Sequence, residues 1–409
     1  MLQENRLNLS AVFCCILAAT LVACGGEVED ASYTHVIAQS DIVRFDADGS
    51  LADIQDVAVA ASGDVWVLQR SHTPHLFVFS AEGDLNDSFG TTGSERNQLS
   101  NPFNLLPTDD SRSPMAVWDA GNRRISVFNT NGRSSSVSVS RSRANPYAEI
   151  ENHSYGKPLA MARFGENYLL MDHSKGLSVT VDYLRSELLR LGQGGELIDT
   201  LVDFGAEFAD SIGMLGRDVN YLAPIPLWAT CADGEMALLD PFSRTLSWYG
   251  SDGTVTGSDV IPVSTRELTV EEKETFLKRR FETMWRERYD GEPDSATVVN
   301  SVEDFILRHS DQFSPSAPPA VGMMCAGARE VWLQEFSTAD HPLGLGTRWL
   351  VHAPQATERV YVQFPSEFRP VRIVDGKVFG VVAVDEDVEV VAYITLPEHI
   401  GPPAAEAAH

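Results

Sequence analysis

A pattern of paired strands recurs six times along this chain of 409 residues, at intervals of about 50 residues. Each copy holds an apolar strand, a short turn, a second apolar strand and a turn that usually contains Gly. The clearest copy is Met115–Gly132, with turns at Asp119–Asn122 and at Asn131-Gly132. A lone four-stranded sheet cannot bury both of its faces, whereas sheets arranged radially about an axis cover one another. Repetition at this period therefore predicts a β-propeller.

Five weaker copies follow the same order of elements. Their paired strands are predicted at 64–69 with 75–79, 167–172 with 187–191, 235–240 with 244–249, 330–335 with 347–351, and 377–382 with 388–393. Most copies begin at a proline, which suits the first residue of a strand because no ladder donor is needed there. These prolines are Pro102, Pro158, Pro226, Pro319 and Pro370. An early strand around Asp41–Phe45 is expected to complete the last blade and close the ring. We therefore predict an all-β fold, a six-bladed propeller over residues 41–400, in preference to a β-sandwich or two small β-domains.

The copy at Met115–Gly132 resembles the NHL repeat of six-bladed β-propellers. In that repeat an apolar strand ends in Asp, and Gly-Asn, a basic residue and an Ile-x-Val-Phe strand follow, as Asp119, Gly121, Asn122 and 124–128 do here. The resemblance implies six blades, and it implies that the acidic residue at the end of the second strand bonds its own turn.

Residues 262–320 interrupt the repeats between the fourth and fifth blades. Thr269 and Glu272 have the spacing of a capping box, which predicts a helix over 270–289. Its apolar stripe holds Leu277, Phe281, Met284 and Trp285. A second helix is predicted over 298–309. The insertion is open to two interpretations, a lid or docking arm over a binding face and a helical layer that only covers the propeller.

Long loops are expected on one face of the propeller. The connection between blades lies on the same face as the turn between second and third strands, and long turns of this kind are predicted at 69–75, 172–185 and 335–346. Polar side chains from several blades could converge there on a ligand. The candidate ligand-binding residues are Arg70, His72, His75, Asp119, Arg123, Asp172, His173, Asp240, Arg244, Glu335 and His341.

Each of these residue types also has a structural explanation. The acidic residues Asp119, Asp172, Asp240 and Glu335 end equivalent strands, so hydrogen bonds within their own turns are the preferred interpretation. The four histidines are expected to be solvated loop residues. No metal-ligand spacing, phosphate-binding loop or GxSxG motif occurs in the sequence. We therefore predict no metal site, no cofactor and no catalytic residue.

Two cysteines, Cys231 and Cys325, occupy equivalent positions in successive repeats. An oxidising compartment would allow them to pair. Neighbouring inner strands are expected to diverge, however, and two Cα atoms more than about 7 Å apart cannot be bridged. Two buried thiols are therefore the preferred expectation, and a disulfide remains open.

The N-terminus indicates export. An uncharged apolar segment, Ala11–Ala23, has the length of a signal-peptide core and is too short to span a bilayer. It ends in Leu21–Gly25, which resembles a bacterial lipobox, so residues 1–23 are predicted to be a lipoprotein signal peptide and Cys24 the lipidated residue. Gly25 in place of Asp implies the outer membrane. Residues 24–40 are predicted to be a polar tether and residues 401–409 a disordered tail.

The net charge of the chain argues against some classes of function. The 31 Lys and Arg against 58 Asp and Glu give a net charge of −27, which would be repelled by nucleic-acid phosphates. Membrane attachment must therefore come from the lipid. We expect a lipid-anchored envelope propeller that binds a protein, peptide or glycan and is not an enzyme. The alternative is a propeller hydrolase of the sugar-lactone type, whose resemblance implies a channel Ca²⁺ held by Asp119, Asp172 and Asp240.

Overall fold

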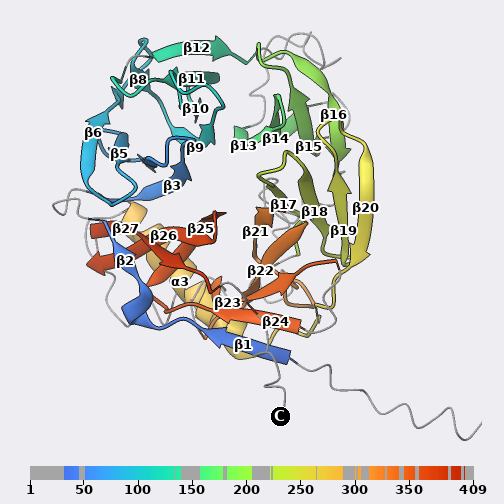
Figure 1. Ribbon diagram of the computed structural model, residues 1–409. Helices are drawn as coiled ribbons and strands as arrows, with labels where there is room; N and C mark the ends of the chain where they lie inside the picture. Colours follow the sequence, from blue (N-terminus) through green and yellow to red (C-terminus); the bar gives the residue numbers. More distant parts are fainter. Residues whose placement is uncertain are drawn as a thin grey trace, which may run out of the picture.

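The computed structural model is a ring of six antiparallel sheets around a common axis (Figure 1). It describes residues 32–45, 51–132, 134–139, 157–177, 182–204, 222, 224–263, 265–288, 300, 303–304, 313–327, 329–339, 345–354, 359–385, 388–397 and 400. The predicted signal peptide, Cys24 and the predicted tail lie outside these residues. The six-bladed all-β propeller predicted from the repeats is confirmed.

Each blade contributes its strands in chain order from the axis to the rim. Blade 1 is β3 (Ile54–Val59), β4 (Val65–Gln69), β5 (Leu76–Phe79) and β6 (Leu85–Phe89). Blade 2 is β9 (Pro102–Pro107), β10 (Met115–Asp119), β11 (Arg124–Phe128) and β12 (Ser134–Ser138). Blade 3 is β13 (Lys157–Phe164), β14 (Asn167–Leu177), β15 (Asp182–Leu191) and β16 (Leu197–Asp203). The short parallel pair β7 (Thr91–Thr92) and β8 (Gln98–Leu99) lies between blades 1 and 2 in the chain.

The second half of the ring also takes strands from the N-terminus. Blade 4 is β17 (Leu227–Thr230), β18 (Met236–Asp240), β19 (Thr245–Tyr249) and β20 (Val255–Val260). Blade 5 is β21 (Gly322–Gly327), β22 (Glu330–Phe336), β23 (Leu345–His352), β24 (Arg359–Gln363) and, outermost, β1 (Ser32–Val36). Blade 6 is β25 (Phe368–Val374), β26 (Lys377–Asp385), β27 (Val388–Thr395) and β2 (Val43–Arg44).

The apolar core lies between the blades. The first strand of each blade contacts the first strand of the next, and β25 contacts β3, so the inner strands form a closed circle. Six buried clusters each join two neighbouring blades, because a pleated sheet presents alternate side chains to both of its faces. Trp66, Trp118, Trp248 and Trp332 are fully buried in these clusters.

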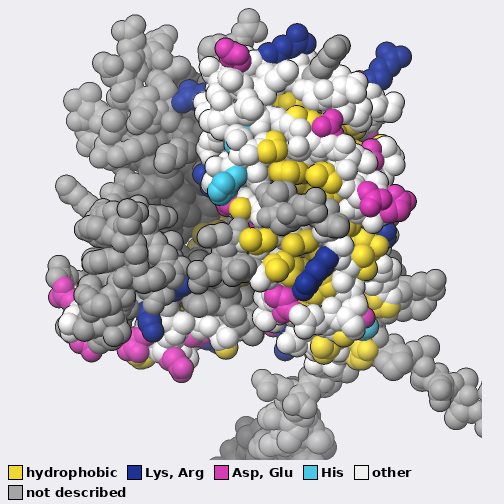
Figure 2. Space-filling view, turned by 90° about the vertical axis from the view of Figure 1, so that its left-hand side faces the viewer, with side chains coloured by type: hydrophobic (Ala, Val, Ile, Leu, Met, Phe, Trp, Pro, Cys, Tyr) yellow, Lys and Arg dark blue, Asp and Glu magenta, His cyan; other side chains and the backbone are white. Residues whose placement is uncertain are grey.

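The predicted closing strand is confirmed. Val43 pairs with Tyr393 of β27, and the Phe45 N–H donates to the Val391 carbonyl at 2.9 Å. The Phe45 ring then packs between blades, 5.5 Å from Phe79 and 5.8 Å from Tyr393. Figure 2 views this side of the molecule, where exposed hydrophobic side chains lie among acidic ones.

The C-terminal part of the predicted tether, residues 32–40, forms regular structure instead. Ser32–Val36 form β1, which runs parallel to β24 with Ser32 opposite Arg359, and the helical turn η1 (Gln39–Asp41) links it to β2. The N-terminal segment therefore joins blade 5 to blade 6 along the rim, and only residues 24–31 remain as a predicted tether.

The structure contradicts the expectation of two free thiols. Cys231 and Cys325 form a disulfide, with Cα atoms 5.1 Å apart. Cys231 follows β17, Cys325 lies in β21, and these two inner strands contact each other. The inner strands do not diverge as expected, because they lie at the smallest radius of the ring.

The insertion contains α3 (Val270–Arg288), which confirms the first predicted helix. Its capping box is formed: the Thr269 N–H donates to Glu272 at 2.9 Å and the Glu272 N–H donates to the Thr269 hydroxyl at 3.2 Å. Leu277 is buried against Phe336 at the end of β22. The side chains of Phe281, Met284 and Trp285 and most of the second predicted helix lie outside the described residues.

Turns and blade connections meet on one face, as predicted. Arg70, after β4, donates to Asn101, before β9, at 3.0 Å, and Arg244, after β18, donates to the Val263 carbonyl at 3.4 Å. We call this the long-loop face, and we call the opposite one, with the first-to-second and third-to-fourth turns, the short-turn face. One predicted long loop is wrong: β14 and β15 extend through most of 172–185 as a hairpin.

Candidate functional site

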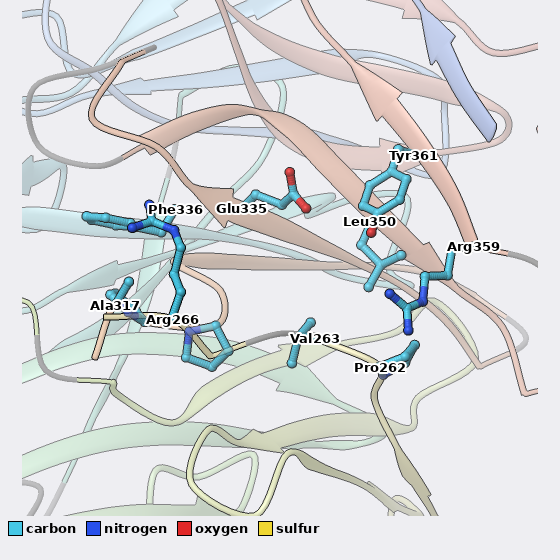
Figure 3. Close-up of a pocket in the computed structure, with 11 residues that line it drawn as sticks. Pro262, Val263, Arg266, Ala317, Glu335, Phe336, Leu350, Arg359 and Tyr361 are labelled. Atoms are coloured by element: carbon cyan, nitrogen blue, oxygen red, sulfur yellow. The ribbon is translucent and has the colours of Figure 1, made fainter. Parts of the chain in front are cut away.

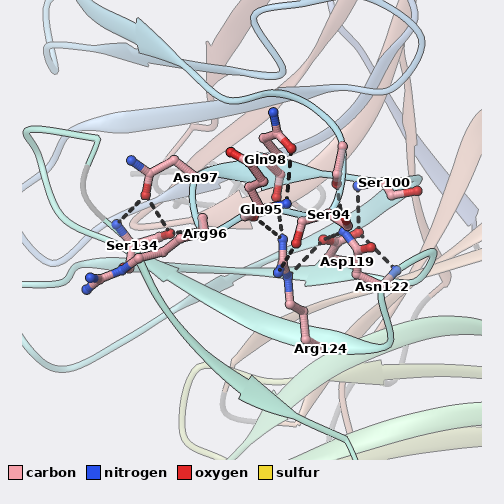
Figure 4. A network of polar contacts seen from close by, with 11 residues as sticks. Ser94, Glu95, Arg96, Asn97, Gln98, Ser100, Asp119, Asn122, Arg124 and Ser134 are labelled. Carbon is pink, nitrogen blue, oxygen red and sulfur yellow. Dashed lines mark hydrogen bonds and ion pairs between the residues drawn. The ribbon is translucent and has the colours of Figure 1, made fainter.

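The acidic residue Asp119 is fully buried and holds its own turn, as the NHL-like motif implies (Figure 4). Its carboxylate accepts hydrogen bonds from the Ser100 N–H at 2.8 Å, from the Asn122 side-chain amide at 2.7 Å and from the Arg124 guanidinium at 3.2 Å. A Cβ at Gly121 would collide with the Ser100 carbonyl, which explains the Gly in this turn. Burial raises the pKa of Asp119, while these donors oppose the shift.

Arg124 fastens the loop before blade 2 to this turn. Its guanidinium donates to the carbonyls of Ser94, Glu95 and Gln98 at 2.9, 2.8 and 2.6 Å. Because Asp119 and Arg124 bond each other and their own loops, few of their donors and acceptors remain for a ligand. The polar network in Figure 4 is therefore a structural clamp between blades 1 and 2.

Asp240 makes the equivalent bonds in blade 4. It accepts from the Phe242 N–H at 2.9 Å and from the Ser243 hydroxyl at 2.7 Å. Asp172 is buried, but it lies within β14, which continues to Leu177, so the prediction that it ends its strand is wrong. Two of the three carboxylates proposed for a channel Ca²⁺ are thus hydrogen-bonded within their own turns, and the set does not fit a shared cation site.

The predicted solvated state of His75 is wrong. His75 is buried, and its ring nitrogens lie 3.2 Å from the Gln69 carbonyl and 3.1 Å from the Thr92 hydroxyl. Burial lowers its pKa, so the neutral imidazole links β4 to β7. His72 is exposed as expected. The side chains of His173 and His341 lie outside the described residues.

The remaining predicted residues do not gather in one place. Arg70, Arg123 and Arg244 are exposed on the long-loop face of blades 1, 2 and 4. Glu335 is half-buried in blade 5, and it alone among the predicted residues lines the pocket described next.

A pocket of about 180 Å³ lies at the seam between blades 4 and 5 (Figure 3). One wall is the face of blade 5 that looks toward blade 4, and the other consists of the two ends of the insertion. The lining residues are Pro262, Val263, Arg266, Ala317, Pro318, Pro319, Glu335, Phe336, Leu350, Arg359 and Tyr361. In Figure 3, Arg266 and Arg359 lie at opposite ends of the pocket.

Ion pairs hold two of the arginines around this pocket. Arg348 lies 3.3 Å from Glu335 and stacks over the Tyr361 ring at 3.7 Å from its centroid. Arg266 forms a two-pronged pair with Glu272, one arm of which is 2.8 Å long, and lies over the Phe336 ring. The Arg266 guanidinium holds the pKa of Glu272 at about 2. Each ion pair lies within one wall of the pocket, and the contact of Arg266 with the Phe336 ring joins the insertion to blade 5.

A second buried charge lies on the inner strands. Asp56 of β3 accepts from the N–H groups of Val57 and Leu105, both at 2.8 Å, and lies 3.5 Å from Arg372 of β25. Asn104 has the same role in blade 2, where its side-chain oxygen accepts a hydrogen bond from the Met161 N–H of blade 3 at 2.9 Å. Both acceptors follow a bulge in their first strand. A polar side chain after the bulge thus ties its blade to the next.

Sequence reasoning missed Arg266, Arg359 and Tyr361 in the pocket and Asp56 with Arg372 at the ring closure. Pro319 is predicted to begin the fifth repeat and Pro318 to lie in the insertion, and neither is predicted to line a pocket. In the described part of the chain no helix is long and apolar enough to cross a bilayer. The same residues contain no group of three His, Cys, Asp or Glu that could hold a metal ion.

The fold and this seam define a six-bladed β-propeller with an interblade pocket. No family model matches the chain and no curated protein does, so the NHL likeness remains a resemblance. Similar solved structures include a candidate exported protein from Bacteroides fragilis, with a TM-score of 0.49, 10% identity and coverage of 90% of this chain and 99% of that one.

Two other similar structures have names that state an activity or a ligand. Virginiamycin B lyase from Staphylococcus aureus has a TM-score of 0.41, 8% identity and coverage of 86% and 98%. The calcium-binding protein regucalcin from Agrobacterium tumefaciens has a TM-score of 0.43, 10% identity and coverage of 90% and 95%. Similarities this weak carry no argument about what this chain binds or catalyses.

Proposed function

We propose that the protein is an exported propeller, anchored through lipid on Cys24 at the outer membrane, that binds a protein, peptide or glycan on its long-loop face. The observation that carries the binding role is the pocket at the blade 4–5 seam, whose wall the insertion builds. The insertion thus does more than cover the propeller. Two of the three carboxylates that the hydrolase alternative requires, Asp119 and Asp240, are engaged in turns, which favours binding over catalysis.

Export has its own support. A disulfide forms and persists in oxidising compartments and is rare in the cytosol of most organisms. The Cys231–Cys325 bond therefore favours a chain that leaves the cytoplasm. The apolar segment that ends at Cys24 supplies the signal for this route.

An anchor at Cys24 would leave the long-loop face accessible. The tether of residues 24–31 reaches at most roughly 28 Å when extended, so it would keep the rim of blade 5 near the bilayer. Ser32 lies opposite Arg359, at the short-turn end of β24, because β1 and β24 are parallel. The tether would thus approach from the short-turn side.

The anchor predicts where a Cys24→Ala variant is found. Without a lipid, the acidic chain has no means of membrane attachment, so we expect it to move from the membrane fraction to the soluble envelope fraction. Fractionation of cells that make the full chain, with incorporation of labelled fatty acid, measures this. Cys15→Ala, within the predicted signal peptide, is the control and should leave the protein in the membrane. A Cys24 variant that still carries label and sediments with membranes would refute the anchor.

Substitutions on the long-loop face should weaken the capture of a binding partner. Arg123 and Arg244 are exposed on the long-loop face, so Arg123→Glu with Arg244→Glu should reduce crosslinking to an envelope partner by about tenfold or more. Arg112→Glu, at an exposed turn on the short-turn face, changes charge in the same direction and serves as the control. Equal crosslinking by all variants would contradict the proposed face, and turnover of lactones by the purified protein would favour the hydrolase.

A further inference from the structure

The outer edge of blade 5 is formed by β1, which adds a fifth strand where the other blades have four. Among the described residues, no further strand pairs with β1 on its outer side. The Ile37 N–H donates to the Gln363 carbonyl at 2.9 Å, so the backbone groups of Ile37 point toward β24. These groups alternate in direction along a strand, so those of every second residue of β1 point outward, away from the sheet. The outward-pointing residues are Ser32, Thr34 and Val36.

The composition of β1 does not protect this edge. Open sheet edges are normally protected by charged side chains or by Pro, which prevent pairing with another chain. β1 reads Ser-Tyr-Thr-His-Val and contains neither, and its aromatic and β-branched residues favour strand pairing. Other outermost strands differ: β6, β16 and β20 carry Asp, and β12 is mostly Ser. Because two copies of a chain with a net charge of −27 repel each other, an uncharged edge is a favourable place for them to meet.

The sequence of β1 is self-complementary in one antiparallel register. With Thr34 opposite Thr34 of a second copy, Ser32 lies opposite Val36 and Tyr33 lies opposite His35. All the outward-pointing residues then form hydrogen-bonded pairs, each of which exchanges both N–H···O bonds, about six bonds in total. A shift by two residues in either direction leaves one outward-pointing residue of each copy without a partner. The centred register also places Thr opposite Thr, which is a favourable cross-strand pair.

We propose that β1 is a self-association strand, whose free edge pairs antiparallel with β1 of a second copy and joins two five-stranded sheets into one. The interface is isologous, because the same residues contribute from both sides of a two-fold axis. The inference concerns the rim of blade 5 and does not depend on what the long-loop face binds.

The arrangement of β1 in the ring suits two copies on one membrane. In Figure 1, which looks along the axis of the ring, β1 runs along the rim and across the viewing direction. A two-fold axis perpendicular to the joined sheet therefore runs along the axis of the ring, and both copies present the same face to the same side. The contact is small, and lipid anchors would strengthen it by confining both copies to one surface, where their effective concentration is high.

Disulfide crosslinking tests the register. Cα atoms of a hydrogen-bonded antiparallel pair lie about 5.5 Å apart, within the range of a disulfide. Thr34→Cys in the full chain, oxidised in membranes of the producing cells, should therefore give a disulfide-linked dimer on a non-reducing gel. Ser32→Cys is the control, because its two copies would lie about 14 Å apart and should give at least tenfold less dimer. Ser32→Cys combined with Val36→Cys should restore the crosslink, since these residues lie opposite each other in the proposed register.

Sedimentation of the purified full chain in detergent measures the association without a crosslink. Between roughly 10 μM and 1 mM the wild-type chain should pass from monomer to dimer. Thr34→Lys places like charges opposite each other at the two-fold axis and should weaken the dimer by about tenfold or more. Val255→Lys, at an exposed residue of the outermost strand of blade 4, adds the same charge and should leave the association unchanged.

Three results would overturn the inference. They are equal yields of dimer from Thr34→Cys and Ser32→Cys, a wild-type chain that sediments as a monomer at every concentration, and equal association of the Thr34→Lys and Val255→Lys chains. A crosslink from Thr34→Cys to a different envelope protein, in place of a second copy, would assign the edge to a strand of that protein and would overturn it as well.

Discussion

Removal of the Cys231–Cys325 disulfide is expected to lower the free energy of unfolding by about 3 to 4 kcal/mol. The bond joins residues 94 positions apart, and the loop that it closes contains the whole insertion. In the unfolded chain it removes a large share of the conformational freedom of that loop. In the folded ring it links β17 to β21, where the chain itself connects blades 4 and 5 only through the insertion.

Urea-induced unfolding, followed by fluorescence of the buried tryptophans, measures this loss. The midpoint of the wild-type protein should fall when a reductant is added, and the double variant Cys231→Ala with Cys325→Ala should unfold at that lower midpoint with or without reductant. Quantification of thiols in the unfolded wild-type chain provides the control for pairing. A midpoint that does not respond to reductant would refute the stabilising role of the bond.

Asp56→Ala is expected to cost about 2 to 4 kcal/mol of folding free energy. Asp56 is 5% exposed, and its loss leaves the Leu105 N–H without its acceptor and Arg372 without its carboxylate. Burial raises the pKa of Asp56 more than Arg372 lowers it, so the charged form is held at a cost. Asp56→Asn keeps the shape and an acceptor without the charge, and we expect it to lose less than half as much.

The same unfolding assay separates these effects. Asp64→Ala removes one negative charge from an exposed turn of the same blade and should change stability by less than about 0.5 kcal/mol. If Asp56→Ala unfolds at the wild-type midpoint, the seam between blades 6 and 1 does not depend on this carboxylate. If Asp56→Asn proves as damaging as Asp56→Ala, the charge itself contributes through Arg372.

Prediction of the site from the sequence succeeded only where a repeat carried the signal. Asp119 was placed at the end of its strand with its turn-bonding role, because the motif around it is local. Glu335 was placed in blade 5 by the same periodicity. Arg266 and Arg359 line the same pocket only because the insertion, which leaves blade 4 after β20, enters the neighbouring blade 5 at β21.

The number of blades, the closing strand, the insertion and the start of its helix could all be predicted from the amino-acid sequence. These features depend on strand periodicity, turns and caps, which involve residues close in the chain. The disulfide, the attachment of β1 to blade 5, the burial of His75 and the seam pocket became known only from the folded structure. Asp56 and Arg372 are 316 positions apart and become neighbours because the ring brings its first and last blades together. Such contacts depend on the radius and closure of the ring, and no local pattern of residues encodes them.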